Sequence, residues 1–138
     1  MPNKKILIVD DEISLRESLG LVLEGSGYDL FFAENGNTAL EMCKKVKPDL
    51  ILLDIYLPDR FGMEIVKIIR SVESLYGDPK IIIITGIANS LEDSKIKSSD
   101  AEDTARALWK KQYDVADFFT KPFNFEVLIN RINEILSK

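Results

Sequence analysis

The chain has no histidine and only one cysteine among its 138 residues. The missing histidine excludes Ser-His-Asp and Cys-His catalysis, a histidine-ligated metal and a phosphohistidine on this chain. The lone Cys43 excludes an intramolecular disulfide and a cysteine-based zinc site. We interpret Cys43 as a small apolar residue of a helix, and a single thiol fits a reducing compartment.

Basic charge and long apolar runs are also scarce. The 18 Lys and Arg residues are outnumbered by 23 Asp and Glu, which gives a formal net charge of -5. A nucleic-acid surface would need a basic face. The apolar run within residues 1–10 is too short for a signal segment, and no stretch approaches the ~20 apolar residues of a membrane span. We therefore predict a cytoplasmic protein that binds neither a membrane nor, directly, nucleic acid.

The length and the apolar pattern together predict the architecture of the chain. A chain of 138 residues corresponds to one domain, so we expect a single domain over residues 1–138 with no output domain. Uninterrupted runs rich in Ile, Leu and Val are typical of strands that are buried on both faces of a parallel sheet. Such runs occupy residues 6–9, 50–53 and 81–84, while the mixed segments 28–33 and 115–119 suit edge strands.

Segments with helical spacing alternate with these strands. They cover residues 13–23, 38–46, 63–72, 104–112 and 125–136. Ser14 is the expected N-cap of the first helix, and Asn124 begins the last. The alternation predicts an α/β, flavodoxin-like, doubly wound sheet of five parallel strands in the order 2-1-3-4-5, with helices on both faces.

A polar stretch at residues 89–103 interrupts this rhythm. Connections between a strand and the next helix usually take ~2–6 residues, and this one is more than twice as long. We therefore expect an insertion that extends the region between the fourth strand and the fourth helix. A short extra helix over 90–97, a solvated loop and a partner-binding element all remain open interpretations.

Polar residues follow the expected strands where the chain leaves the sheet. Asp10 and Asp11 follow the first strand, Asp54 the third, Thr85 the fourth and Lys121 the fifth. Sites in open α/β sheets lie at the carboxyl ends of the strands. Each residue alone also has a structural interpretation, such as an aspartate at a helix N-terminus or a surface lysine. Their joint placement at successive strand ends indicates a site.

The residue types at this edge indicate phosphoryl chemistry. Three close carboxylates repel one another, and a bound cation relieves the repulsion. Oxygen ligands without histidine or thiolate favour Mg²⁺ before Ca²⁺, and Mg²⁺ commonly takes a phosphate oxygen as a further ligand. Lys121 would supply a positive charge, Thr85 a hydroxyl, and a carboxylate nucleophile could accept the phosphoryl group.

From Lys4 to about Leu136 the sequence closely resembles the receiver domain of two-component response regulators. The resemblance rests on residues 6–12 (ILIVDDE), 54–58 (DIYLP) with Gly62, Thr85-Gly86, and 121–123 (KPF). It implies that Asp54 is the phosphoacceptor. It also implies that Mg²⁺ or Mn²⁺ is held by Asp11, Asp54 and the backbone carbonyl of Tyr56, with Asp10 acting largely through water.

The resemblance also assigns the remaining site residues. Lys121 would pair with the phosphoryl group, and its bond to Pro122 would be cis. Thr85 would be the switch hydroxyl, and Phe118 would be the switch aromatic whose ring turns inward on activation. Because Phe119 stands beside it, a plain core role for Phe118 remains open.

The implied function is that of a signalling switch, not an enzyme beyond self-catalysed phosphotransfer and autodephosphorylation. A histidine kinase or histidine phosphotransfer protein would be the donor and would dock near residues 14–21 and the loop after the fifth strand. A downstream protein or attached effector domain would respond, and a homodimer is left open. The alternative is a pseudo-receiver that binds partners without phosphorylation. An aspartyl phosphatase is disfavoured, because position 56 is tyrosine rather than a second acid.

Overall fold

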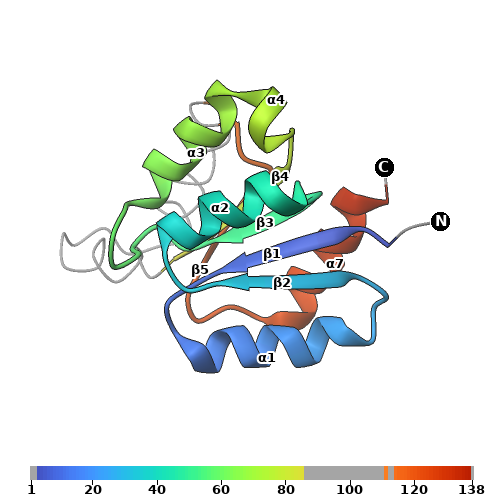
Figure 1. Cartoon of the computed structure of the whole chain (residues 1–138). Coiled ribbons are helices and arrows are strands. Elements are labelled where there is room, and N and C mark those ends of the chain that lie inside the picture. The colour runs from blue at the N-terminus through green and yellow to red at the C-terminus, as the bar shows by residue number, and fades with distance from the viewer. Residues whose placement is uncertain (1–2, 86–110, 112–113, 138) are drawn as a thin grey trace.

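The strands form one parallel sheet in the computed structural model, which describes residues 3–85, 111 and 114–137. They are β1 (Lys5–Val9), β2 (Asp29–Ala33), β3 (Leu50–Leu53), β4 (Lys80–Thr85) and β5 (Asp117–Thr120). The sheet order is β2-β1-β3-β4-β5, and every neighbouring pair is parallel (Figure 1). The predicted topology is therefore confirmed.

Helices cover both faces of the sheet. In Figure 1, α2, α3 and α4 lie above the sheet, and α1 and α7 lie on the opposite side. Their bounds are α1 (Ile13–Glu24), α2 (Gly36–Val46), α3 (Gly62–Ser71), α4 (Glu73–Tyr76) and α7 (Phe125–Leu136). The short helix α4 was not predicted from the sequence.

The side chains of each central strand alternate between two hydrophobic cores. Leu7 and Val9 of β1 belong to the core under α2 and α3, while Ile6 and Ile8 belong to the core under α1 and α7. All four are almost fully buried. Burial of one such side chain contributes about 1.5–3 kcal/mol, so both faces of the strand must be apolar. This explains why the strand runs contain no polar residue.

The starts of α1 and α2 differ from the sequence prediction. Ser14 is not the N-cap of α1, because the helix already begins at Ile13 and Glu12 occupies the cap position without a side-chain cap. Helix α2 begins at Gly36, two residues before the predicted start, because the side chain of Asn35 accepts the N–H of Thr38 at 2.8 Å. The predicted cap Asn124 is confirmed, and it accepts the N–H of Val127.

Some sequence predictions concern residues that lie outside the described part of the chain. The insertion at 89–103 lies outside the described residues, so its three interpretations, including a short helix at 90–97, stay open. The helix predicted at 104–112 also lies outside them except for residue 111. Strand β5 begins at Asp117, two residues later than its apolar pattern indicates. Among the described helices, none combines the length and apolarity needed to cross a membrane.

Cys43 lies on the inner side of α2 and is completely buried in the core under that helix. Burial raises the pKa of its thiol to about 12. The interpretation of Cys43 as a small apolar core residue is confirmed.

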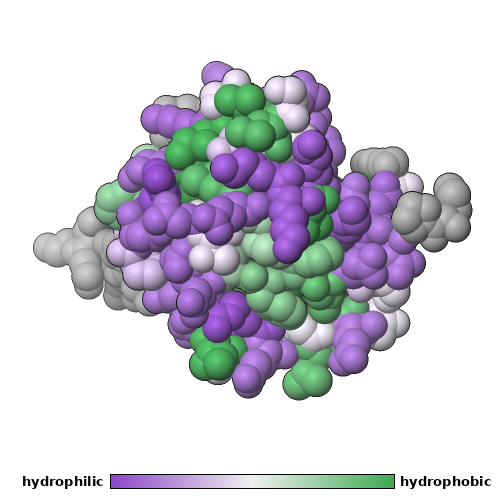
Figure 2. All heavy atoms as spheres, viewed as in Figure 1, coloured by the Kyte–Doolittle hydropathy of each residue, from purple (hydrophilic) through white to green (hydrophobic). Residues whose placement is uncertain are grey.

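Apolar atoms gather in two places on the face seen in Figure 2, along β2 and over the region of α3 and α4. Phe32 on β2 and Val72 and Leu75 near α4 are among the exposed large hydrophobic residues. A cavity of about 780 Å³ runs between α1 and β2 beside Phe32. Polar residues separate the two patches.

Candidate functional site

Three carboxylates converge at the carboxyl end of the sheet. Asp10 follows β1 and Asp54 follows β3, and both are buried, whereas Asp11 is exposed. One oxygen from each carboxylate lies within 4.8 Å of the others. The backbone N–H groups of Asp10 and Asp54 donate to Ala33 and Val9 at 3.1 and 3.0 Å, which continues the sheet beyond the strand ends. The sheet therefore fixes where these side chains emerge.

Lys121, which directly follows β5, is the basic residue of the site. Its Nζ lies 2.9 Å from Asp10 Oδ2, 3.2 Å from Asp54 Oδ2 and 3.1 Å from Glu12 Oε1. The Lys121–Pro122 peptide bond is cis, the isomer that the resemblance implies. One ammonium group thus faces three carboxylates, and Asp11 adds a fourth nearby, so the cluster carries excess negative charge.

Local backbone groups orient the two buried aspartates. Asp10 Oδ1 accepts the N–H of Glu12 at 2.9 Å, and Asp54 Oδ1 accepts the N–H of Tyr56 at 3.1 Å. Arg16 of α1 donates to the backbone carbonyl of Asp10 at 2.7 Å. In each aspartate, Oδ1 therefore accepts the backbone N–H two residues further along the chain, and Oδ2 faces Lys121.

Burial and charge shift the pKa values of the central pair. Burial raises the pKa of Asp54 to about 6, and the charge of Asp10 adds to this, while Lys121 and the Tyr56 N–H oppose it. Burial would lower the pKa of Lys121, but its hydrogen bond to Asp10 and the charges of Asp54 and Asp10 outweigh that effect and raise it. Asp10, Glu12 and Asp54 thus share the ammonium group of Lys121, which stays firmly protonated.

Gly62 brings α3 close to the backbone of Asp54. A Cβ atom at this position would lie 2.8 Å from the Asp54 carbonyl oxygen, which is closer than real contacts allow. The Gly62 N–H donates to the carbonyl of Ile55 at 2.6 Å. Only glycine permits this approach, which closes the loop that follows Asp54.

Two half-exposed aromatic rings border the site on this loop. Tyr56 and Phe61 form an isolated antiparallel bridge, and their ring centroids lie 6.0 Å apart in an edge-to-face arrangement. Both residues are about half exposed, so the loop next to Asp54 presents an aromatic surface to solvent.

The predicted switch residues lie on the neighbouring strands. Phe118 of β5 is fully buried in the core under α2 and α3, whereas Phe119 packs into the core of the opposite face. Thr85 ends β4 and pairs in register with Thr120, and its side chain lies outside the described residues.

Sequence reasoning missed two residues that contact this region. Glu12 ends the acidic run Asp10-Asp11-Glu12 and received no role from the sequence, although its Oε1 lies 3.1 Å from Lys121 Nζ. Asp59 was not singled out, yet its carboxylate accepts the N–H groups of Gly36 and Asn37 at the start of α2. The acidic run was a usable signal for Glu12, whereas no sequence pattern pointed to Asp59.

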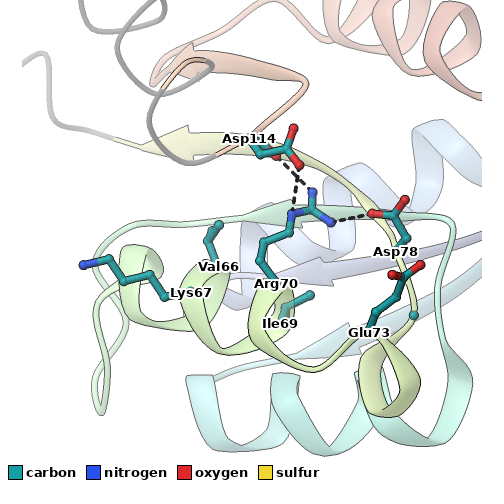
Figure 3. A pocket seen from close by; sticks show the side chains of 8 residues that line it. Val66, Lys67, Ile69, Arg70, Glu73, Asp78 and Asp114 are labelled. Carbon is teal, nitrogen blue, oxygen red and sulfur yellow. Dashed lines mark hydrogen bonds and ion pairs between the residues drawn. The ribbon is translucent and has the colours of Figure 1, made fainter.

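A second polar cluster surrounds Arg70 at the C-terminal end of α3 (Figure 3). Its guanidinium contacts Asp78 Oδ1 at 3.0 Å, the backbone carbonyl of Asp114 at 3.0 Å and Asp114 Oδ2 at 3.6 Å. The cluster lines a cavity of about 480 Å³ that includes none of the residues at the carboxyl-end site. It links α3 to the segments before β4 and β5.

A family model and a curated relative match the chain. The model of the response regulator receiver domain matches residues 6–133. The phosphate regulon transcriptional regulatory protein PhoB of Pseudomonas aeruginosa is 36% identical over 138 residues, which is all of this chain and 54% of that protein. The chain therefore spans about half the length of this relative.

Solved structures agree with these matches. A CheY-like response regulator receiver domain protein from Methanospirillum hungatei has a TM-score of 0.74 and 27% identity, and the match covers 98% of this chain and 94% of that one. The chemotaxis response regulator CheY4 of Vibrio cholerae has a TM-score of 0.75 and 28% identity, with 96% and 98% covered. With matches that span the sheet and the acidic strand ends alike, the chain belongs to the response regulator receiver domain family.

Proposed function

We propose that the chain is a phosphoacceptor switch in which Asp54 receives a phosphoryl group from a phosphohistidine of a partner histidine kinase or histidine phosphotransfer protein. The observation that carries this proposal is the buried Asp54 carboxylate, which lies beside Asp10 and Asp11 and contacts Lys121. An aspartate with a purely structural role would be neutralised by a cation of its own. Asp54 instead shares the ammonium group of Lys121 with Asp10 and Glu12.

The donor set fits a hard divalent cation, Mg²⁺ or Mn²⁺. One oxygen each from Asp10, Asp11 and Asp54 lies within 4.8 Å of the others, and the chain has no histidine to compete as a ligand. These carboxylates and the backbone carbonyl of Tyr56 would hold the ion. When bound, it would neutralise the clustered charge and pair with an oxygen of the phosphoryl group.

The chain's own residues perform the transfer. A carboxylate oxygen of Asp54 forms a bond to phosphorus while the bond from phosphorus to the donor imidazole nitrogen breaks, and the electron pair of that bond returns to the nitrogen. Lys121, at 3.2 Å from Asp54, supplies positive charge where phosphoryl oxygens would sit. The Tyr56 N–H, bonded to Asp54 Oδ1, leaves the second oxygen of the carboxylate for attack. Catalysis is then mainly positioning and charge neutralisation.

The switch would run through β4 and β5. The hydroxyl of Thr85 would move toward the phosphoryl oxygens, and the ring of Phe118 would turn with it. The parallel pairing of β4 with β5 supports this coupling, because it sets Phe118 beside Ile83 and Thr120 beside Thr85. The resulting change would control binding of a downstream protein or an attached effector domain.

The donor would dock between α1 and the segment after β5. A shallow cavity of about 250 Å³ lies there, lined in part by Ser14, Leu15 and Phe123, and it borders Lys121. Ile13 is largely exposed at the start of α1 and supplies an apolar contact nearby. A donor histidine seated at this cavity would reach Asp54 across Lys121.

The proposal does not extend to an enzyme acting on separate substrates or to a pseudo-receiver. A pseudo-receiver would need neither the acidic cluster nor Lys121 beside Asp54. Position 56, where a second acid would serve an aspartyl phosphatase, holds the half-exposed Tyr56. We also propose that residues 1–138 are one receiver domain, and its cytoplasmic location stays a prediction.

The test is incubation with acetyl phosphate and Mg²⁺, followed by intact mass measurement. The parent chain is expected to gain the mass of one phosphoryl group, and Asp54→Ala is expected to gain none. The matched control is Asp78→Ala, which removes an aspartate of the distant Arg70 cluster and is expected to behave like the parent. A chelator is expected to abolish the gain. A parent chain that gains no mass and does not respond to beryllofluoride would favour the pseudo-receiver.

A further inference from the structure

Asp59 joins the loop after Asp54 to the start of helix α2. Its Oδ1 accepts the backbone N–H of Gly36 at 2.7 Å, and its Oδ2 accepts that of Asn37 at 2.9 Å. Although slight burial opposes the effect, these two N–H groups lower the pKa of Asp59, so the carboxylate stays ionised at neutral pH. Both oxygens of one exposed carboxylate are therefore bonded to a different element of the fold.

The contacts complete the N-terminus of α2. The first four N–H groups of a helix have no partner within the helix. Asp59 bonds those of Gly36 and Asn37, while the side chain of Asn35 bonds that of Thr38. Two different residues thus cap one helix, and Asp59 does so from the loop that follows Asp54.

The loop itself is closed by short backbone bonds. Leu57 N–H donates to the carbonyl of Arg60 at 3.3 Å, and Tyr56 bridges to Phe61 at the base of the loop. Arg60 strengthens the link to α2, because its Nε donates to Asn37 Oδ1 at 2.9 Å. Because Asp59 and Arg60 are bonded to α2, the rest of the loop can move less. Tyr56, whose N–H donates to Asp54 Oδ1, belongs to this loop.

We propose that Asp59 is a positioning residue for the acidic site: by bonding the start of α2, it holds the backbone of Tyr56 so that Asp54 and the Tyr56 carbonyl keep their orientation. This inference rests on the proposed function, because the Tyr56 carbonyl matters only if a cation and a phosphoryl group bind there. Asp59 acts through Tyr56 and does not touch the reacting atoms.

Asn35 provides the matched control. It caps the same helix with a side-chain oxygen, at 2.8 Å from the Thr38 N–H, but it does not belong to the loop after Asp54. If Asp59 only stabilised α2, Asp59→Ala and Asn35→Ala would have the same effects on thermal stability and on the acidic site. If Asp59 positions Tyr56, the two variants differ at the site while losing similar thermal stability.

The experiment compares the parent chain with Asp59→Ala, Asp59→Asn and Asn35→Ala. Mg²⁺ affinity is measured by calorimetry, and the phosphorylation rate is measured with acetyl phosphate. Asp59→Ala is expected to weaken Mg²⁺ binding by ~10-fold, the usual lower range for an outer residue that orients metal ligands, and to slow phosphorylation. Asp59→Asn should recover part of the affinity, because its amide oxygen still accepts one N–H. Asn35→Ala should match the parent in both measurements.

A third readout is independent of metal and phosphoryl transfer. Amide hydrogen exchange at Tyr56 is measured in metal-free protein and is expected to speed up in Asp59→Ala but not in Asn35→Ala. Unchanged exchange in Asp59→Ala, or equal effects of both alanine variants, would overturn the inference. A parent chain that binds no Mg²⁺ would overturn the proposed function instead, while the exchange data would still decide whether Asp59 fixes Tyr56.

Discussion

Lys121 and Arg70 each face several carboxylates, yet their surroundings differ. Lys121 contacts Asp10 and Asp54, whose side chains are only 4% and 6% exposed. Arg70 contacts Asp78 and Asp114, whose side chains are 69% and 87% exposed. Lys121 faces three carboxylates and Arg70 faces two, so acids outnumber the basic group in both clusters, and the burial of the acids is the larger difference between them.

Burial changes what an excess of acid costs. Exposed ion pairs contribute about 0–1 kcal/mol because water and salt screen them. Buried ions cost several kcal/mol each in lost solvation, which a single partner offsets only in part. The raised pKa of Asp54 reports this imbalance. An acid-rich cluster therefore suggests a ligand site where the acids are buried, and an ordinary surface network where they are not.

Removal of each basic side chain should give the largest contrast. Lys121→Ala leaves Asp10 and Asp54 facing each other without a cation, so we expect a loss of about 3 kcal/mol in the free energy of unfolding at pH 7.5 without Mg²⁺. Arg70→Ala should lose about 1 kcal/mol or less. Urea unfolding measures both.

Mg²⁺ provides the control for this first contrast. It should restore part of the loss in Lys121→Ala and leave the deficit of Arg70→Ala unchanged. Equal losses in the two variants would mean that burial does not distinguish the clusters.

Replacing one aspartate in each cluster by asparagine should change the free energy of unfolding by less than removal of the basic side chain. For Asp54 the change should be a gain in stability rather than a loss. The pKa of Asp54 is about 6 in the folded chain against an ordinary value of 3.8, so the folded state binds this proton more tightly. The stability that protonation provides is therefore complete below pH 4 and lost as the pH rises through 6. Asp54→Asn should raise the free energy of unfolding at pH 8 by about 1–2 kcal/mol, because the neutral amide resembles the protonated carboxyl and avoids the cost of ionising a buried acid.

The matched variant for this second contrast is Asp78→Asn. We expect it to change the free energy of unfolding by less than about 0.5 kcal/mol at either pH, because its carboxylate is exposed. Urea titrations of metal-free protein at pH 4 and pH 8 measure both variants. A gain in Asp54→Asn that is as large at pH 4 as at pH 8 would contradict the assignment of the effect to ionisation.

Salt should give the smallest contrast. Raising NaCl shortens the screening length from about 14 Å at 0.05 M to about 4 Å at 0.5 M. The stability difference between the parent and Arg70→Ala should shrink by a few tenths of a kcal/mol, whereas that between the parent and Lys121→Ala should persist. Parallel urea titrations at the two salt concentrations measure this, and equal salt sensitivity would indicate that solvent reaches both clusters alike.

The sheet and the core of the site could be predicted from sequence because both follow from local pattern. The run from Ile6 to Val9 has no polar residue because α/β packing buries both strand faces. The residues that follow such runs must emerge at one edge of a parallel sheet, which brings Asp10, Asp54 and Lys121 together. No knowledge of individual contacts was needed.

Contacts that depend on three-dimensional approach were not predictable in this way. Asp59 reaches Gly36 across 23 residues, and nothing in the local sequence of either segment indicates the pairing. Ser14 has a favourable side chain for an N-cap, but the chain already turns into α1 at Ile13 because Asp10 holds the Glu12 N–H. At α1 a local side-chain hydrogen bond therefore overrides the capping propensity of Ser14, whereas at α2 a tertiary hydrogen bond completes the start of the helix.

The burial of Cys43 also has a practical consequence. A thiol with no exposed surface and a pKa of about 12 is almost entirely protonated near neutral pH and should resist alkylating reagents in the folded state. The native chain can therefore serve as its own background for site-directed labelling. A cysteine introduced at an exposed position such as Phe61 would carry a fluorophore or spin label selectively and report movement of the loop beside Asp54.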